Sequence, residues 1–558
     1  MKTRSAVLFA ITILVLIYGV IYPNLFVVAT SLQRDGSWTL ANYREVLSQG
    51  IVIEALLNSI VLSIGTVLFC ALVGVPLAFL FERFDFPGRR IFAALAALPL
   101  VLPPLVGTVA FIFLFGESGI LAHSIQNLLG LQRPPWTLGG WSALLFFHTY
   151  TMYPFFYVLT GAGLRRIDAS LAEAASSLGA SRFVVTRRVL LPQLTPSLIA
   201  AALLTFMTSM ASFSAPLLFG GQVRVLTLEI FTARQRGDNV LGVTETVVLA
   251  IISLAALIFF QRYEGTRKFA AAAMKGAPRR RAAIVSGKAR AIATIVAVVF
   301  ALVLVLPVAT LILVSFAREG SWTTQTLPSA YTVANYVRLF SEPLAAEVFV
   351  NSLLMSAIAA VAALVWSFCV VILLVKRGRG GVFDQGWRRL LSLMVLIPWA
   401  LPGTVVAVSV AEAYGRPGSL LGSFVLVGTF WILPVVYFLR FMPLVVRALQ
   451  ASMEQLDPSL DEAAGSLGAR PWQRFLRVTL PLVWPGAVAG TLLAFVIALG
   501  EYVASVLVFV PANRPISIAI ASELRDFNLG AAAAYGVVLI VIISISMLVA
   551  GKLERMRG

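Results

Sequence analysis

The sequence predicts an all-α integral membrane protein of about twelve transmembrane helices, arranged as two parallel six-helix repeats. Hydrophobic residues make up 59% of the 558 residues and charged residues only 12%. Soluble domains are close to half apolar and a quarter charged, so this composition indicates a membrane protein. Apolar runs long enough to cross a bilayer recur along the chain, and basic residues gather in alternate segments between them.

Each half of the chain contains six apolar runs. We expect helices, because a segment surrounded by lipid must satisfy its own backbone hydrogen bonds. The first run is too long for a typical signal peptide, so we expect it to remain as a span. The expected spans are 6–32, 54–81, 91–115, 141–163, 196–220 and 241–261, then 289–316, 348–375, 388–414, 422–446, 485–509 and 533–551.

The distribution of lysine and arginine supports this span order. If both termini are cytoplasmic, 32 of the 43 basic residues lie in cytoplasmic segments and 11 in outer ones. This bias follows the positive-inside rule, so the net charge of +18 is mainly a signal of topology. We therefore expect the lipid bilayer as a partner and no nucleic acid.

The chain is an internal duplication. We expect a first repeat at 1–262, a basic cytoplasmic linker at 263–288 and a second repeat at 289–558. Offsets between matching residues change only across loops, as insertions would produce. The pairs are Asn42-Tyr43 with Asn335-Tyr336, Asn58-Ser59 with Asn351-Ser352, Pro99 and Pro103 with Pro398 and Pro402, and Glu173, Gly179 and Pro192 with Glu462, Gly468 and Pro481.

The most distinctive repeated stretch reads EAASSLGASRFVVTRRVLLP in the first half and EAAGSLGARPWQRFLRVTLP in the second. Both copies fall between the fourth and fifth spans, near 165–192 and 454–481. The opening residues favour a short helix, and a glycine permits a sharp corner. A second short amphipathic helix follows, and we expect Pro192 or Pro481 to end it before the next span.

This spacing resembles the EAA loop of ABC importer permeases, and its double occurrence covers essentially the whole chain. The chain is similar to the fused, duplicated permeases of binding-protein-dependent importers of ferric iron, thiamine or aminoethylphosphonate. Val189 and Val478 stand where that family commonly has isoleucine. The resemblance implies a bacterial plasma (inner) membrane location.

The resemblance also implies partners and contact residues. The loops would dock on a cytoplasmic ABC ATPase, in two identical copies, and a periplasmic or extracellular binding protein would deliver the solute. The chain has no Gly-x4-Gly-Lys-Ser/Thr loop of its own. The implied ATPase-coupling residues are Glu173, Ala174, Ala175, Gly179, Glu462, Ala463, Ala464 and Gly468.

The solute pathway is predicted less sharply. The fifth spans carry Ser212-Phe213 and, in register, Glu501-Tyr502, which we take as pathway residues. A carboxylate within a span points to function, so Glu501 would line the path and favour a cation or an amine. The equal alternative places it near the outer interface, or paired with an arginine. We expect the third-span prolines to bend their helices and Glu412 to lie at a helix end.

Other classes of protein fit less well. An ion-driven secondary transporter also has twelve spans in two halves, and it would take up solute without ATP. A membrane enzyme would need a catalytic cluster, and the two histidines, His123 and His148, have no metal-ligand spacing. The two cysteines lie inside apolar runs and give no disulfide framework. We therefore expect no catalytic residue, no metal and no cofactor.

Overall fold

The computed structural model describes residues 2–265, 282–283, 286–322, 325–375, 382–417 and 425–555. Nearly all regular structure in these ranges is helical, which confirms the predicted fold class. The strands are two residues long: β1 (Gln33–Arg34) pairs antiparallel with β2 (Ser37–Trp38), and β3 (Phe84–Asp85) pairs parallel with β4 (Ala282–Ala283). Most of the predicted basic linker at 263–288, including Arg279, Arg280 and Arg281, lies outside the described residues.

Ten helices in the described ranges are long and apolar enough to cross a membrane, and one sharply bent pair of helices brings the number to eleven. Helix α8 (Gly140–Arg166) is not among them, although it has 27 residues. At 1.5 Å per residue it is about 40 Å long, which exceeds the hydrocarbon thickness of about 30 Å. Counting α8, the described helices account for the twelve predicted spans.

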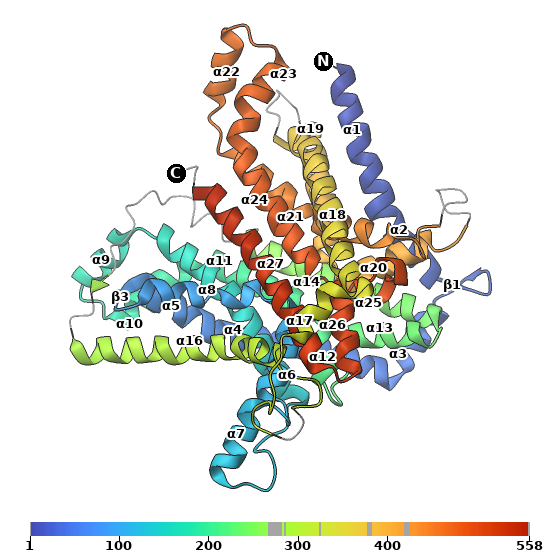
Figure 1. Cartoon of the computed structure of the whole chain (residues 1–558). Helices are drawn as coiled ribbons and strands as arrows, with labels where there is room; N and C mark the ends of the chain where they lie inside the picture. The colour runs from blue at the N-terminus through green and yellow to red at the C-terminus, as the bar shows by residue number, and fades with distance from the viewer. Residues whose placement is uncertain are drawn as a thin grey trace. The chain divides into compact units, whose positions relative to one another are not determined.

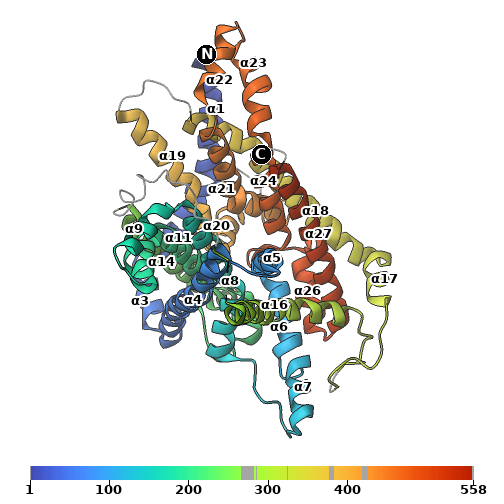
Figure 2. The same cartoon turned by 90° about the vertical axis from the view of Figure 1, so that its left-hand side faces the viewer.

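The chain forms two compact units. Unit 2 comprises Glu45–Ala233 and Val248–Val333. Its centre is α4, which packs on α8, and α8 in turn packs on α11 (Figures 1 and 2). Its helices are α4 (Gly50–Arg83), α5 (Arg89–Leu95), η2 (Leu98–Val101), α6 (Pro104–Phe115), α7 (Ile120–Leu129), α8, α9 (Ala169–Ser177), α10 (Arg182–Val185), η3 (Thr186–Leu190), α11 (Leu191–Met210), α12 (Ser214–Phe219) and α16 (Gly287–Ser315).

Unit 1 comprises Met1–Arg44, Arg234–Val247 and Ala334–Gly558. Its centre is α18 packed on α21, with α24 against both. Its helices are α1 (Lys2–Leu16), η1 (Ile17–Ile21), α2 (Tyr22–Ser31), α17 (Ala334–Ser341), α18 (Pro343–Val375), α19 (Val382–Ala400), α20 (Gly403–Tyr414), α21 (Ile432–Glu454), α22 (Pro458–Ser466), α23 (Pro471–Arg474), η4 (Phe475–Thr479), α24 (Leu480–Leu499), α25 (Ser505–Val508), η5 (Pro511–Asn513), α26 (Ile516–Arg525) and α27 (Leu529–Arg555).

Three further helices lie at the borders of these segments. Helix α3 (Ala41–Ser48) begins in unit 1 and ends in unit 2. Helix α13 (Leu226–Gln235) begins in unit 2 and ends in unit 1. Helix α14 (Asn239–Gly265) begins in unit 1 and continues in unit 2. The last of these is the sixth span predicted for the first half.

Each unit contains the first span of the other sequence repeat. In unit 1, the hydroxyl of Tyr414 on α20 donates to the carbonyl of Tyr18 at 2.6 Å. In unit 2, the hydroxyl of Tyr150 on α8 donates to the carbonyl of Leu304 on α16 at 2.8 Å. The compact units therefore exchange their first spans relative to the order of the sequence.

Small residues allow the central helices to approach closely, as is common inside membranes. A Cβ atom at Gly74 of α4 would lie 2.6 Å from the carbonyl oxygen of Tyr153 on α8. A Cβ atom at Gly490 of α24 would lie 2.5 Å from the Cβ of Ala448 on α21. Any larger side chain at Gly74 would have to move backbone, so this position tolerates only glycine.

The predicted bends of the third spans are present. In the second half, the helix breaks between Ala400 and Gly403 with a bend of 103°. In the first half, α5, η2 and α6 are separate short helices around Pro99 and Pro103. Proline removes a backbone donor and clashes with the preceding turn, which explains the breaks.

Candidate functional site

The candidate functional site is the pair of loops that carry the EAA pattern. Loop 1 consists of α9, α10 and η3 in unit 2, and loop 2 of α22, α23 and η4 in unit 1 (Figure 1). An aspartate caps the first helix of each. The carboxylate of Asp168 accepts the N–H of Ser170, and that of Asp457 accepts the N–H of Ser459, both at 2.9 Å. A carboxylate at this position also interacts favourably with the helix dipole.

The first helix of each loop ends at a glycine in the left-handed conformation, with φ of +82° at both Gly179 and Gly468. Other residues rarely adopt this conformation, so glycine is required for the corner. The hydrogen bonds form a Schellman motif. They run from Gly179 N–H to Ser176 O and from Ala180 N–H to Ala175 O in loop 1, and from Gly468 N–H to Gly465 O and from Ala469 N–H to Ala464 O in loop 2.

The cap of loop 2 gives a testable pH dependence. The backbone N–H of Ser459 first, and then its hydroxyl, lower the pKa of Asp457. A carboxyl with a lowered pKa stabilises the folded loop above its unfolded pKa of about 3.9, and the effect is lost as the pH falls through the lowered value. Hydrogen-exchange protection of α22 should therefore fall in strong acid. The Asp457→Asn variant keeps a neutral cap and should not show that fall; identical profiles would contradict the assignment.

The interior of loop 1 is apolar. Ala172 and Val185 are buried with Leu190 and Leu194 in one cluster, and Ala175 packs against it. Small alanines on the first helix let the second helix lie close. This packing explains why a small residue stands at Ala175 of the EAA pattern.

Loop 2 has a different and partly exposed interaction at the same two positions, with the side chain of Asp461 58% exposed. Asp461 and Arg474, which correspond to Ala172 and Val185, form an ion pair with 2.9 Å between Oδ2 and Nη1. Arg474 also donates to the backbone carbonyl of Asp461 at 3.3 Å. The two loops therefore have the same backbone turns, but apolar packing joins the two helices of loop 1 and an ion pair joins those of loop 2.

The two glutamates of the EAA pattern are exposed to solvent. Glu173 and Glu462 lie on the first helix of their loops, and the following Ala174 and Ala463 are exposed as well. By contrast Ala175 and its counterpart Ala464 are half-buried. The glutamates are therefore free to face a partner, while the second alanine serves the loop itself.

The prediction that Pro192 and Pro481 end a short helix is wrong. The helix continues from Phe183 to Met210 and from Pro471 to Leu499, through both prolines. The turn before each proline widens into a π-helix, with Leu191 N–H donating to Thr186 O and Leu480 N–H donating to Phe475 O. A π turn adds a residue where proline cannot complete the α-helical pattern, so the loop is joined directly to the fifth span.

The fifth spans end earlier than predicted. Helix α11 ends at Met210 and α24 at Leu499, so the proposed pathway residues lie after the helices and not within them. Ser212 follows the end of α11 and Glu501 follows the end of α24. Phe213 is 1% exposed and Tyr502 3% exposed, so both are packed inside their units.

In unit 2 the break is held by His148, which is fully buried on α8. Its Nε2 lies 2.9 Å from the hydroxyl of Ser212, and its Nδ1 lies 3.1 Å from the hydroxyl of Thr66 on α4. Thr227 also donates to the carbonyl of Ser212 at 2.7 Å. His148 was not a predicted site residue, because no metal-ligand spacing surrounds it; the available signal was its place inside a predicted span.

In unit 1 the break carries a buried ion pair. Glu501 is 6% exposed, and its Oε1 lies 3.0 Å from Nη1 of Arg440 on α21. The same carboxylate accepts the N–H of Ala504 at 2.9 Å. Among the alternatives considered for Glu501 from the sequence, the structure shows the pairing with an arginine.

A glycine makes room for this arginine. A Cβ atom on Gly403, at the start of α20, would overlap Nη1 of Arg440. Glu412 also pairs with an arginine, with 2.7 Å to Arg234, two residues before α20 ends. Arg440 was not among the predicted site residues; the available signal was a charged residue inside the predicted span at 422–446.

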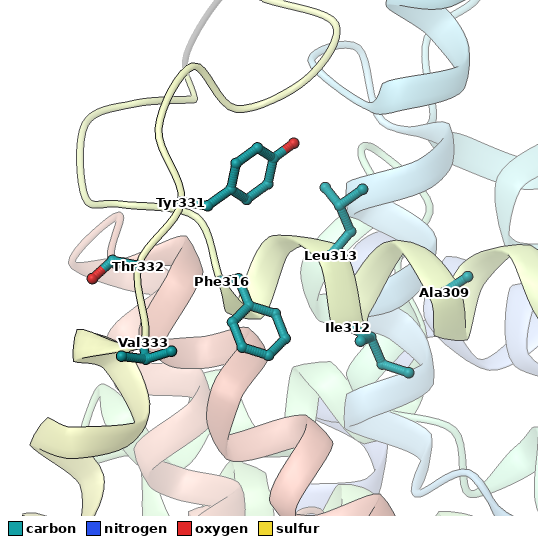
Figure 3. A pocket seen from close by; sticks show the side chains of 7 residues that line it. All are labelled: Ala309, Ile312, Leu313, Phe316, Tyr331, Thr332 and Val333. Atoms are coloured by element: carbon teal, nitrogen blue, oxygen red, sulfur yellow. The ribbon is translucent and has the colours of Figure 1, made fainter.

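Two cavities lie outside the loops and breaks. The larger, of about 540 Å³, is mainly apolar and is lined by the end of α16 and the loop that follows, with Phe316 and Tyr331 as its aromatic residues (Figure 3). The smaller, of about 190 Å³, includes Arg234, Glu412 and Arg416. Within the described residues no group of three histidine, cysteine or acidic side chains is placed to hold a metal.

The fold and the paired loops define a class: a duplicated, multi-pass membrane permease. Both halves match the family described as "Binding-protein-dependent transport system inner membrane component", at residues 71–265 and 370–557. The chain belongs to this family, which comprises permease subunits of ABC importers.

Curated relatives agree with the family. The probable ABC transporter permease protein y4fN of Sinorhizobium fredii is 31% identical over 501 residues, or 89% of this chain and 87% of the relative. The ferric transport system permease protein FbpB of Actinobacillus pleuropneumoniae is 25% identical and covers 95% of this chain and 75% of its own length. A putative 2-aminoethylphosphonate permease, PhnV of Salmonella paratyphi A, is 29% identical over 48% of this chain and 96% of its own length.

Proposed function

We propose that the chain is the translocation subunit of an ATP-driven importer, and that loops 1 and 2 transmit the work of a partner ATPase. The observation that carries this proposal is the recurrence of one loop geometry in both units. The aspartate cap, the exposed glutamate and the glycine corner have the same spacing in each. Glu173, Ala174 and Gly179, with Glu462, Ala463 and Gly468, form the contact surface, and Ala175 and Ala464 hold its backbone.

The ATPase is a separate subunit, present in two identical copies. The sequence has no Gly-x4-Gly-Lys-Ser/Thr loop in which backbone amides would hold phosphates. Since the chain carries two matching loops, one copy would bind each. ATP binding would draw the copies together, and the continuous helices from Phe183 and from Pro471 would carry that movement into the fifth spans.

The orientation follows the charge pattern. With both termini and both loops in the cytoplasm of a bacterium, 32 of 43 basic residues lie on the cytoplasmic side. A solute-binding protein then docks on the opposite, outer face and releases its solute there. Alternating exposure of the pathway moves the solute inward.

The pathway passes the breaks after the fifth spans, which contain Ser212, Phe213, Glu501 and Tyr502. Because Phe213 and Tyr502 are packed inside their units, they support the breaks from within. Because Arg440 neutralises Glu501, this carboxylate does not by itself favour a cation. Its role is to hold the break, through Ala504, in one conformation. Ferric iron and aminoethylphosphonate are the solutes that two relatives' names suggest, and thiamine is the third solute that the family resemblance implies.

The decisive experiment is uptake by proteoliposomes that contain the full chain, its ATPase and its binding protein. We expect uptake of the solute only with ATP on the ATPase side, and none with a non-hydrolysable analogue. Calorimetry of the binding protein with ferric iron, 2-aminoethylphosphonate and thiamine would name the solute. Uptake driven by an ion gradient without ATP would refute the importer assignment and favour a secondary transporter.

A further inference from the structure

One leucine in each loop is almost completely exposed. Leu178 and Leu467 each stand directly before the corner glycine, and each is 88% exposed. These are the highest exposed fractions among the large hydrophobic side chains of the described residues. Both lie outside the helices that are long and apolar enough to cross a membrane, so a place within a span does not account for them.

The apolar surface extends beyond this leucine in the same way in both loops. Loop 1 adds Leu171, 39% exposed, and Phe183, 70% exposed. Loop 2 adds Leu460 and Trp472 at the matching positions, 46% and 52% exposed. Leu171 and Leu178 are seven residues apart, close to two helical turns, so both lie on one side of α9.

The exposed apolar side chains match between the loops although the contacts between the two helices of each loop do not. Loop 1 buries Ala172 and Val185, whereas loop 2 has at these two positions a partly exposed ion pair of Asp461 and Arg474, with side chains 58% and 26% exposed. Exposed leucine adds no internal packing, so the stability of a loop does not require it. The contacts within the loops vary while the exposed apolar residues are retained, so these exposed residues are what a partner recognises.

The corner geometry fixes where this leucine points. The Schellman motif locks the residue before the glycine, since bonds on either side of it hold Leu178 in loop 1 and Leu467 in loop 2. No atom outside the corner itself lies within 4 Å of a Cβ placed on Gly179 or Gly468. The side chain therefore projects from a rigid corner into open space, which suits an anchor that enters a preformed pocket.

We infer that Leu178 and Leu467 are the apolar anchors of the two loops, each entering an equivalent hydrophobic pocket on one of two identical ATPase subunits. This inference rests on the proposed function and adds the residues that supply binding energy. Glu173 and Glu462, on the adjacent helix, supply orientation. Because the pockets are identical, the two leucines contribute equally although the contacts within the two loops differ.

The test measures binding of the purified ATPase subunit to the full chain in lipid nanodiscs. Leu178→Ala and Leu467→Ala should each weaken the affinity of their site by about 10- to 100-fold, the worth of one buried leucine. Leu178→Met and Leu467→Met, which keep the volume, should restore most of it. Leu128→Ala removes a leucine that is 83% exposed in α7, outside both loops, and should change nothing.

The outcomes separate this inference from the proposed function. If the wild-type chain does not bind the ATPase, the proposed function fails. If the wild-type chain binds the ATPase, and both alanine variants bind it with the same affinity, Leu178 and Leu467 are not anchors, while the proposed function stands. If only one of the two alanine substitutions weakens ATPase binding, the inference of two identical pockets is wrong. A polarity-sensitive dye on Leu178→Cys that reports an apolar environment before ATPase is added would identify lipid as the occupant and also overturn the inference.

Discussion

Replacing Glu173 and Glu462 together by lysine should abolish ATP-driven uptake while the chain still inserts in the membrane. Both side chains are exposed, so the change does not disturb packing inside either loop. It reverses the charge at the centre of each proposed contact surface, and association depends on the electrostatic complementarity of the two surfaces. The measurement is solute uptake in proteoliposomes, with ATPase binding followed in parallel.

A matched control uses Glu319→Lys, which makes the same charge change at an exposed position outside both loops. This variant should bind the ATPase as the wild-type chain does. Each single variant, Glu173→Lys or Glu462→Lys, should retain binding at the unaltered loop. Normal ATPase association and uptake in the double variant would exclude the loops as the coupling surface.

Breaking the buried ion pair of Arg440 and Glu501 in unit 1 should lower the free energy of unfolding more than any other substitution proposed for this protein. Glu501→Ala leaves Arg440 without its partner and removes the acceptor of the Ala504 N–H. Loss of one member of a buried pair typically costs about 3–5 kcal/mol, because the remaining charge is uncompensated. Thermal unfolding in nanodiscs should show a clearly lower midpoint for this variant.

Gly403 offers an independent way to disturb the same pair. Because its Cβ would occupy the place of Arg440 Nη1, Gly403→Ala should push the guanidinium away from Glu501. In an Arg440→Leu/Glu501→Leu background the same alanine should have little effect, since the guanidinium is gone. Replacing both charges should also be less harmful than removing one. If Gly403→Ala lowers the unfolding midpoint equally in the wild-type chain and in the Arg440→Leu/Glu501→Leu variant, the alanine does not act through the ion pair.

The sequence predicted the helical class, the duplication and the positions of both loops because these depend on composition and local spacing. The glycine at the corner of each loop is a local signal of this kind. The structure has this glycine in the left-handed conformation at both Gly179 and Gly468.

Other features depend on residues far apart in the chain. Arg440 meets Glu501 across 61 positions, and His148 meets Ser212 across 64, so neither contact could be predicted from spacing. The prolines of the Leu-Pro motif were misjudged because a π turn accommodates them, which a rule for regular helices does not include. The exposed leucines could not be predicted, because leucine is common throughout this apolar chain and only the structure shows which leucines are exposed.

The exchange of first spans has a consequence for biosynthesis. Asn24 of α2 accepts a hydrogen bond from Ser409 of α20, a residue 385 positions later. At 5–20 residues per second, about 20 to 80 s pass between the synthesis of these two residues. During that interval the earliest helix of the chain waits in the bilayer without its final neighbour. A ribosome that stalls within the second half would therefore leave an N-terminal helix that is inserted but unassembled, and membrane proteases would meet that species first.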